Sequence, residues 1–121
     1  MATVDSFAKK LDDKRRLSIP AEVRGEFASG AIITRGFEGE RYLHLYSKAV
    51  WDQEMEPKLQ GDILSKDVAD LNVQFRRGKV ESELDDSQGR LTLSKQLLEY
   101  AGITKDVQVD RVGRYWRISP A

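Results

Sequence analysis

An internal repeat most restricts the fold of this 121-residue sequence, because two copies of one unit imply two copies of one local structure. A shift of 74 residues brings similar side chains into register. The matched pairs are Asp12 with Asp86, Arg16 with Arg90, Leu17 with Leu91, Ser18 with Thr92, Ile19 with Leu93 and Val23 with Leu97. A second block, RYLHLY at 41–46, lies over RYWRIS at 114–119 after a small gap. This order of matches indicates a duplicated unit, at about 11–46 and 85–119.

The first unit is predicted to form a strand, a short helix and a β-hairpin. Residues 16–19 alternate polar and apolar side chains, which is typical of a strand. Pro20 suits the first turn of a short helix, where its missing N–H loses no intrahelical partner, and residues 21–28 are predicted to form that helix. The β-rich segments 31–35 and 41–46 flank a loop with two glycines and predict a hairpin.

The second unit has clearer helix ends. Ser94 is a typical N-cap residue, and Gly102 is a typical residue just after a helix C-terminus. Residues 107–119 then alternate around Val112 and Gly113, which predicts the second hairpin.

The segment between the units has a helical pattern. Ser47 is a typical cap for a helix with apolar side chains at 51, 55 and 59, and Pro57 predicts that this helix ends or kinks just before it. Apolar side chains at 64, 68, 71 and 75 predict an amphipathic helix over 65–77, which Gly78 would end.

The predicted organisation is one compact domain, because 121 residues suffice to bury one core. It comprises a first unit at 1–46, a helical insert at 47–78 and a second unit at 79–121. The apolar stripes of the insert must be buried, either on the β core of the same chain or against a helix of a neighbouring subunit.

The formal net charge is zero, which by itself argues against a nucleic-acid partner. The charges are unevenly distributed, however. Residues 9–24 carry six basic against three acidic side chains, and residues 81–100 carry two basic against five acidic ones. This asymmetry creates a local positive potential on a neutral chain.

Enzyme chemistry has little support in the sequence. The single histidine, His44, lies in a strand pattern and has no nucleophile arrangement beside it. SFAK at 6–9 matches a Ser-x-x-Lys nucleophile motif, but its companion motifs are missing. There is no phosphate-binding glycine loop and no cysteine, and the paired aspartates are too few for a metal site. We therefore expect no enzyme activity, no metal, no cofactor and no small-molecule substrate.

The chemistry of interest lies in the turn Asp-x-x-x-Arg at the start of each unit. Its aspartate can accept backbone N–H groups and also pair with the arginine, which holds the guanidinium in one orientation. Such an arginine presents a planar donor fork to a phosphate or to the major-groove edge of guanine. The simpler alternative is a surface turn with a weak ion pair, which contributes about 0–1 kcal/mol.

These motifs resemble the MraZ family. The resemblance rests on LDDKRRLSIPAEVR, ITRGFEG, SQGRLTLSKQLLEYAGI and VGRYWRIS, in the family order over residues 11–119. MraZ proteins belong to the AbrB-like, swapped-hairpin group of bacterial transcription factors. The resemblance implies an α+β fold of tandem AbrB-like β-α-β units that form a pseudo-twofold β barrel, with a two-helix insert between them.

The resemblance also implies a function. It predicts a sequence-specific regulator that binds double-stranded DNA, a repressor of the division and cell-wall gene cluster acting on short direct repeats in its own promoter. Ring-shaped homo-oligomers and a cytoplasmic, nucleoid-associated location without a membrane follow from it. By position, the expected DNA contacts are Lys14, Arg15, Arg16 and Arg90, and the orienting acids are Asp12 and Asp86.

The chain departs from the family pattern at several positions. Arg15 stands where the family usually has glycine, and Ser94 stands where it usually has proline. An extra residue precedes Arg90, so that either Asp85 or Asp86 is the acid of the second motif. If one of the two turns makes most of the DNA contact, we expect it to be the first, which carries Lys14 and Arg15.

Two other classes of function remain open at this point. An AbrB-type antitoxin or another protein-interaction module would bind a protein partner. A self-assembling ring scaffold would have no role on DNA.

Overall fold

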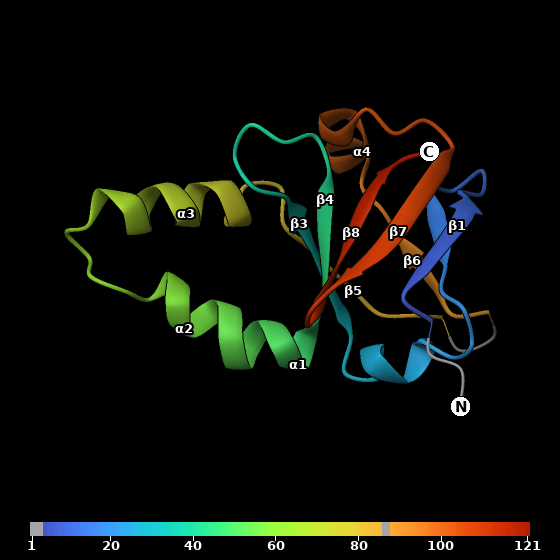
Figure 1. Ribbon diagram of the computed structural model, residues 1–121, viewed down its shortest axis with the longest axis horizontal. Coiled ribbons are helices and arrows are strands. Elements are labelled where there is room, and N and C mark those ends of the chain that lie inside the picture. Colours follow the sequence, from blue (N-terminus) through green and yellow to red (C-terminus); the bar gives the residue numbers. More distant parts are fainter. Residues whose placement is uncertain (1–3, 86–87) are drawn as a thin grey trace.

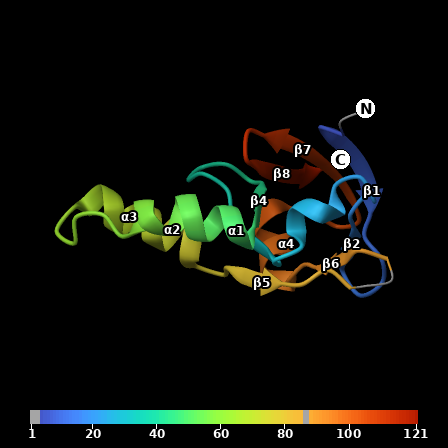
Figure 2. The same cartoon turned by 90° about the horizontal axis from the view of Figure 1, so that it is seen from below.

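The computed structural model describes residues 4–85 and 88–121 and has an α+β fold. Its β-rich body carries a helical arm that extends to one side (Figures 1 and 2). The strands are β1 (Ser6–Lys10), β2 (Arg16–Ser18), β3 (Ala31–Arg35), β4 (Leu43–Ser47), β5 (Val80–Ser82), β6 (Arg90–Thr92), β7 (Asp106–Val112) and β8 (Tyr115–Pro120). The helical segments are η1 (Arg24–Phe27), α1 (Lys48–Val50), η2 (Trp51–Met55), α2 (Glu56–Leu59), α3 (Lys66–Arg76) and α4 (Lys95–Ala101).

The strands form two antiparallel sheets within the described residues. The larger sheet has the order β1-β7-β8-β4-β3-β5, and the smaller one pairs β2 with β6. The expected hairpins are present as β3–β4 and β7–β8. The α+β class is therefore confirmed, while closure into a pseudo-twofold barrel stays a prediction.

The two repeats meet in the small sheet, which we call the β2–β6 ribbon. Its central pair is Leu17 with Leu91, two repeat-equivalent residues. The N–H of Ile19 donates to the carbonyl of Gly89, and the N–H of Leu93 donates to the carbonyl of Arg15, both over 2.8 Å. These matched bonds make the ribbon locally symmetric, and they join segments that are 74 residues apart.

Alternation along the ribbon separates core from surface. Leu17, Leu91 and their neighbours Ile19 and Leu93 are fully buried in the main hydrophobic cluster. Because successive strand side chains point to opposite faces, the arginines of β2 and β6 lie on the outer face.

The short helix of the first unit differs from the prediction. Residues 21–28 form only the 3₁₀ helix η1, and the carbonyl of Pro20 before it accepts the N–H groups of Val23 and Arg24. Pro20 has no side-chain acceptor for a cap, and Gly25 lowers helix propensity by about 1 kcal/mol. At the equivalent position of the second unit, Ser94 accepts the N–H of Leu97 and α4 forms.

The first helix of the insert does not end at Pro57. Segments α1, η2 and α2 follow one another without a break from Lys48 to Leu59. The η2 segment is a π turn in which the N–H of Glu56 donates to the carbonyl of Trp51. This wider turn lies directly before the residue that lacks an N–H, so the helix absorbs the proline there.

A second, smaller cluster attaches the insert to the sheet. It contains Ile32 and Tyr46 from the sheet and Trp51, Leu59 and Phe75 from the helices. Of the predicted stripe on α3, only Phe75 is buried, and Leu64 lies before the helix and is 90% exposed. Ile63 and Leu71 are also exposed, so burial on the same chain accounts for only one end of the stripe.

His44 is a fully buried strand residue at this junction. Its Nδ1 lies 2.9 Å from the hydroxyl of Tyr46, and its ring lies among those of Phe37, Phe75 and Tyr115. Burial, together with the charge of Arg117, lowers the pKa of His44 to about 4. The neutral ring therefore belongs to the packing of the insert on the sheet.

No helix in the described part of the chain is long and apolar enough to cross a lipid bilayer.

Candidate nucleic-acid interface on the paired turns

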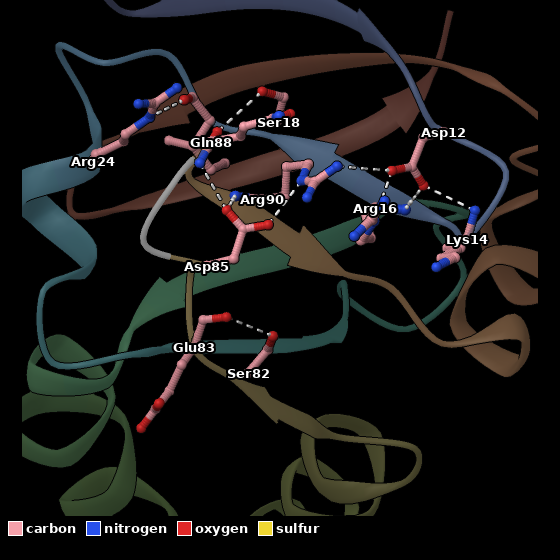
Figure 3. A network of polar contacts seen from close by, with 11 residues as sticks. Asp12, Lys14, Arg16, Ser18, Arg24, Ser82, Glu83, Asp85, Gln88 and Arg90 are labelled. Carbon is pink, nitrogen blue, oxygen red and sulfur yellow. Dashed lines mark hydrogen bonds and ion pairs between the residues drawn. The ribbon is translucent and has the colours of Figure 1, made fainter.

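The first turn, residues 12–16, is organised around one carboxylate. The side chain of Asp12 accepts the N–H of Lys14 at 2.9 Å, the N–H of Arg16 at 3.0 Å and Nε of Arg16 at 2.7 Å (Figure 3). Burial acts to raise the pKa of Asp12, but the N–H donors of Arg16 and Lys14 hold it below its ordinary value. The turn therefore presents Arg16 in one fixed orientation.

The second turn, residues 85–90, repeats this arrangement with one more residue. Asp85 accepts the N–H of Gln88 at 2.9 Å and Nε of Arg90 at 2.7 Å. The N–H of Gln88 and the guanidinium of Arg90 lower the pKa of Asp85 to about 2. The expected orienting residue Asp86 lies outside the described residues, and the carboxylate that holds Arg90 is that of Asp85.

The residue before each arginine has a left-handed backbone. Arg15 has φ of 59° and Gly89 has φ of 58°, at equivalent positions of the repeat. This conformation costs an L-residue about 1–2 kcal/mol, which glycine avoids. Arg15 is exposed and occupies it nonetheless.

Asp12 also lies near the arginine of the other turn. Its Oδ2 is 3.7 Å from Nη1 of Arg90 and 2.7 Å from Nε of Arg16. The guanidiniums of Arg16 and Arg90 thus both reach the carboxylate of Asp12 (Figure 3). The helical insert extends from the opposite side of the body (Figure 2).

The residues that the sequence predicts to contact DNA lie on the β2–β6 ribbon and on the turn that precedes β2. Arg16 and Arg90 are partly covered, with 27% and 22% of their side chains exposed, whereas Lys14 and Arg15 are exposed. Arg16 and Arg90 are therefore held by carboxylates, whereas the side chains of Lys14 and Arg15 are exposed to solvent.

Sequence reasoning missed Arg24 in η1. Its Nε donates to the carbonyl of Ile19 at 2.8 Å, and its side chain lies against Gly89. In the sequence, Arg24 is only one of the six basic residues of segment 9–24. No linear pattern links residue 24 to residue 89.

The serine of the Ser-x-x-Lys motif has a structural contact instead. Ser6 of the SFAK motif donates its hydroxyl to Asp110 within the sheet. Across residues 4–85 and 88–121 there is no cluster of three or more histidine, aspartate or glutamate side chains suited to a metal ion.

Comparison with known proteins identifies the class of protein to which this chain belongs. No family model matches the chain. A transcriptional regulator MraZ of Kineococcus radiotolerans is 38% identical over 104 residues, which cover 86% of this chain and 71% of the relative. A transcriptional regulator MraZ of Kocuria rhizophila is 34% identical over 108 residues, covering 89% and 73%.

The chain is thus a transcriptional regulator, a class that generally has no enzymatic activity. It belongs to the MraZ family.

Proposed function

We propose that the chain binds double-stranded DNA sequence-specifically through the outer face of the β2–β6 ribbon. The observation that carries this proposal is the fixed pair Arg16 and Arg90, each held by a carboxylate at 2.7 Å on adjacent strands. Arginine offers a rigid fork of donors that matches a phosphate or the O6 and N7 atoms of guanine.

The carboxylates orient these arginines rather than cancel them. Asp12 and Asp85 each bond Nε and backbone N–H groups, while the guanidinium has further donors for a second partner. Lys14 and Arg15 add exposed charge beside Arg16, and such charge neutralises phosphates.

A chain of zero net charge contacts few phosphates by itself, so we propose that several copies act together. Binding of one copy raises the effective concentration of the next at a repeated site. Ile63 at 93% exposure and Leu64 at 90% offer apolar surface for contact between copies in a ring-shaped homo-oligomer.

The family resemblance extends the proposal to the biological role. The regulator represses the division and cell-wall gene cluster from short direct repeats in its own promoter. It acts in the cytoplasm on the nucleoid.

The test is binding of fluorescein-labelled promoter duplex by the wild type and by an Arg16→Ala/Arg90→Ala variant across a salt series. The variant should lose affinity, and its dependence on salt should become less steep. Arg41→Ala/Arg114→Ala is the matched control, since it removes the same charge away from the ribbon. A double variant of the ribbon that keeps both affinity and salt dependence rules out this interface.

A further inference from the structure

The two turns differ in the cations they carry themselves. The first turn has Lys14 and Arg15, and the equivalent positions of the second turn are Gln88 and Gly89. A pair of symmetry-related turns on one ribbon therefore has an exposed arginine at only one of the two left-handed positions.

Arg24 lies at the position where the second turn lacks this cation. A Cβ added to Gly89 would come within 2.9 Å of Cζ of Arg24, so the guanidinium lies directly against the glycine backbone. Two bonds fix this placement. Nε of Arg24 donates to the carbonyl of Ile19, and the N–H of Ile19 donates to the carbonyl of Gly89, each over 2.8 Å.

The guanidinium and the rest of the ribbon form one continuous row. Figure 3 shows Arg24 beside Gln88 at one end of the network, with Arg90 in the middle and Lys14 at the other end. The glycine is suited to this approach, because any side chain at residue 89 would displace Arg24.

We propose that Arg24 is a further DNA-contacting residue, which supplies to the second turn the cation that Arg15 supplies to the first. This inference rests on the proposed function of the ribbon. Nε is engaged with Ile19, and the planar guanidinium has further N–H donors on its two Nη groups. A phosphate is the ligand suited to such a held guanidinium.

Acidic side chains near Arg24 should weaken its proposed contact with a phosphate. Arg24 borders a cavity of about 340 Å³ together with Glu83 and Asp85. Asp85 is already paired with Arg90, so among the described residues Glu83 is the carboxylate of this cavity without such a pairing. Glu83→Gln should therefore tighten binding of duplex DNA at low salt.

The experiment compares Arg24→Gln with Arg24→Lys on a fluorescein-labelled duplex across a salt series. Glutamine keeps a side-chain N–H donor for Ile19 without the charge, whereas lysine keeps the charge. Arg24→Gln should make the slope of log affinity against log salt shallower by about 0.9, the value of one phosphate contact, and Arg24→Lys should leave it unchanged. Arg114→Gln, on the β7–β8 turn, is the matched control and should leave the slope unchanged.

Hydrogen exchange on the wild-type protein provides a second readout that needs no variant. Addition of the duplex should protect the amides of residues 22–27 together with those of the first turn. An unchanged salt slope in Arg24→Gln, or no protection of 22–27, overturns the role of Arg24. If Arg16→Ala/Arg90→Ala loses binding in the same assay, the proposed interface survives that result, and if it does not, both proposals fall.

Discussion

Arg15 and Gly89 occupy equivalent positions in the two repeats and share one backbone conformation, with φ of 59° and 58°. Their carbonyls make the same bond, each accepting an N–H from the opposite strand over 2.8 Å. The turn therefore demands a left-handed residue at this point, whatever side chain it carries. Glycine meets the demand without strain, and arginine meets it at an energetic cost that a functional side chain would explain.

Replacement of Arg15 by glycine should raise the stability of the fold and lower its affinity for DNA. Arg15→Gly relieves left-handed strain of about 1–2 kcal/mol and adds flexibility to the unfolded chain worth about 0.5–1 kcal/mol, so we expect a net gain near 0.5–1 kcal/mol. Urea denaturation measures this gain, and DNA affinity should fall in the same variant. A variant with lower stability would contradict the strain argument.

Replacement of Gly89 by alanine should be more harmful than the same change in another left-handed glycine. Gly89→Ala adds strain and displaces Arg24, whereas Gly113→Ala adds strain with no atom within 4 Å of the new Cβ. The loss of the Arg24 bond to Ile19 should make Gly89→Ala less stable than Gly113→Ala by about 1 kcal/mol. Equal stability of the two variants in urea denaturation would show that Arg24 moves aside freely.

Asp12 should contribute to the sequence specificity of DNA binding, and not only to the charge of the interface. Asp12→Asn and Asp13→Asn remove the same negative charge, but only Asp12 holds Arg16 and lies near Arg90. Loss of a carboxylate alone favours phosphate binding, so Asp13→Asn should bind all duplexes slightly more tightly. Asp12→Asn should instead lose preference for the promoter duplex over a scrambled one, as competition binding measures. The same preference in both variants would mean that Asp12 does not orient the arginines.

Acid should destabilise the fold through His44 before the carboxylates titrate. The pKa of His44 is about 4 in the folded chain and 6.5 in the reference state, so the unfolded chain binds a proton first as the pH falls. Stability is fully present above pH 6.5 and should decline by about 3 kcal/mol by pH 4. Urea denaturation of wild type and His44→Gln over this range measures the effect.

The glutamine variant serves as the control, because it cannot titrate. Its stability should change less with pH than that of the wild type between pH 6.5 and 4. A hydrogen bond from Arg76 helps to lower the pKa of Glu56 from 4.5 to about 2, so the stability that Glu56 contributes is lost only as the pH falls below about 4.5, mainly outside this window. If the free energy of unfolding of the two proteins depends on pH in the same way, His44 is not the cause of the loss of stability.

Polar substitution on the exposed tip of the insert should weaken assembly without unfolding the chain. Ile63→Ser and Leu64→Ser alter side chains that are almost fully exposed, so the melting temperature of the isolated chain should hardly change. Light scattering should report smaller assemblies, and binding to tandem sites should fall more than binding to one site. Asp62→Ser is the control at the same loop, and assemblies of unchanged size in all three variants would exclude this surface.

Local patterns predicted much of the fold. Both hairpins, the caps Ser47 and Ser94 and the left-handed Gly102 follow from interactions within a few residues of the chain. The short helix predicted at 21–28 forms only as a 3₁₀ helix over 24–27, because the position that would cap it holds Pro20 and its interior holds Gly25.

The continuation through Pro57 could not be read from the sequence either. A proline usually marks a boundary, and only the π turn before it, next to the packing of Trp51 and Leu59 on the sheet, allows the helix to continue.

The repeat, the two acid–base turns and the positions of Lys14, Arg15, Arg16 and Arg90 were determined by the sequence alone, because spacing and residue type record them directly. Tertiary structure decided what these residues face. Pairing of β2 with β6 brings together arginines 74 residues apart and places Arg24 over Gly89. Such contacts depend on how the buried leucines of two distant strands pack against one core, and no local pattern encodes that packing.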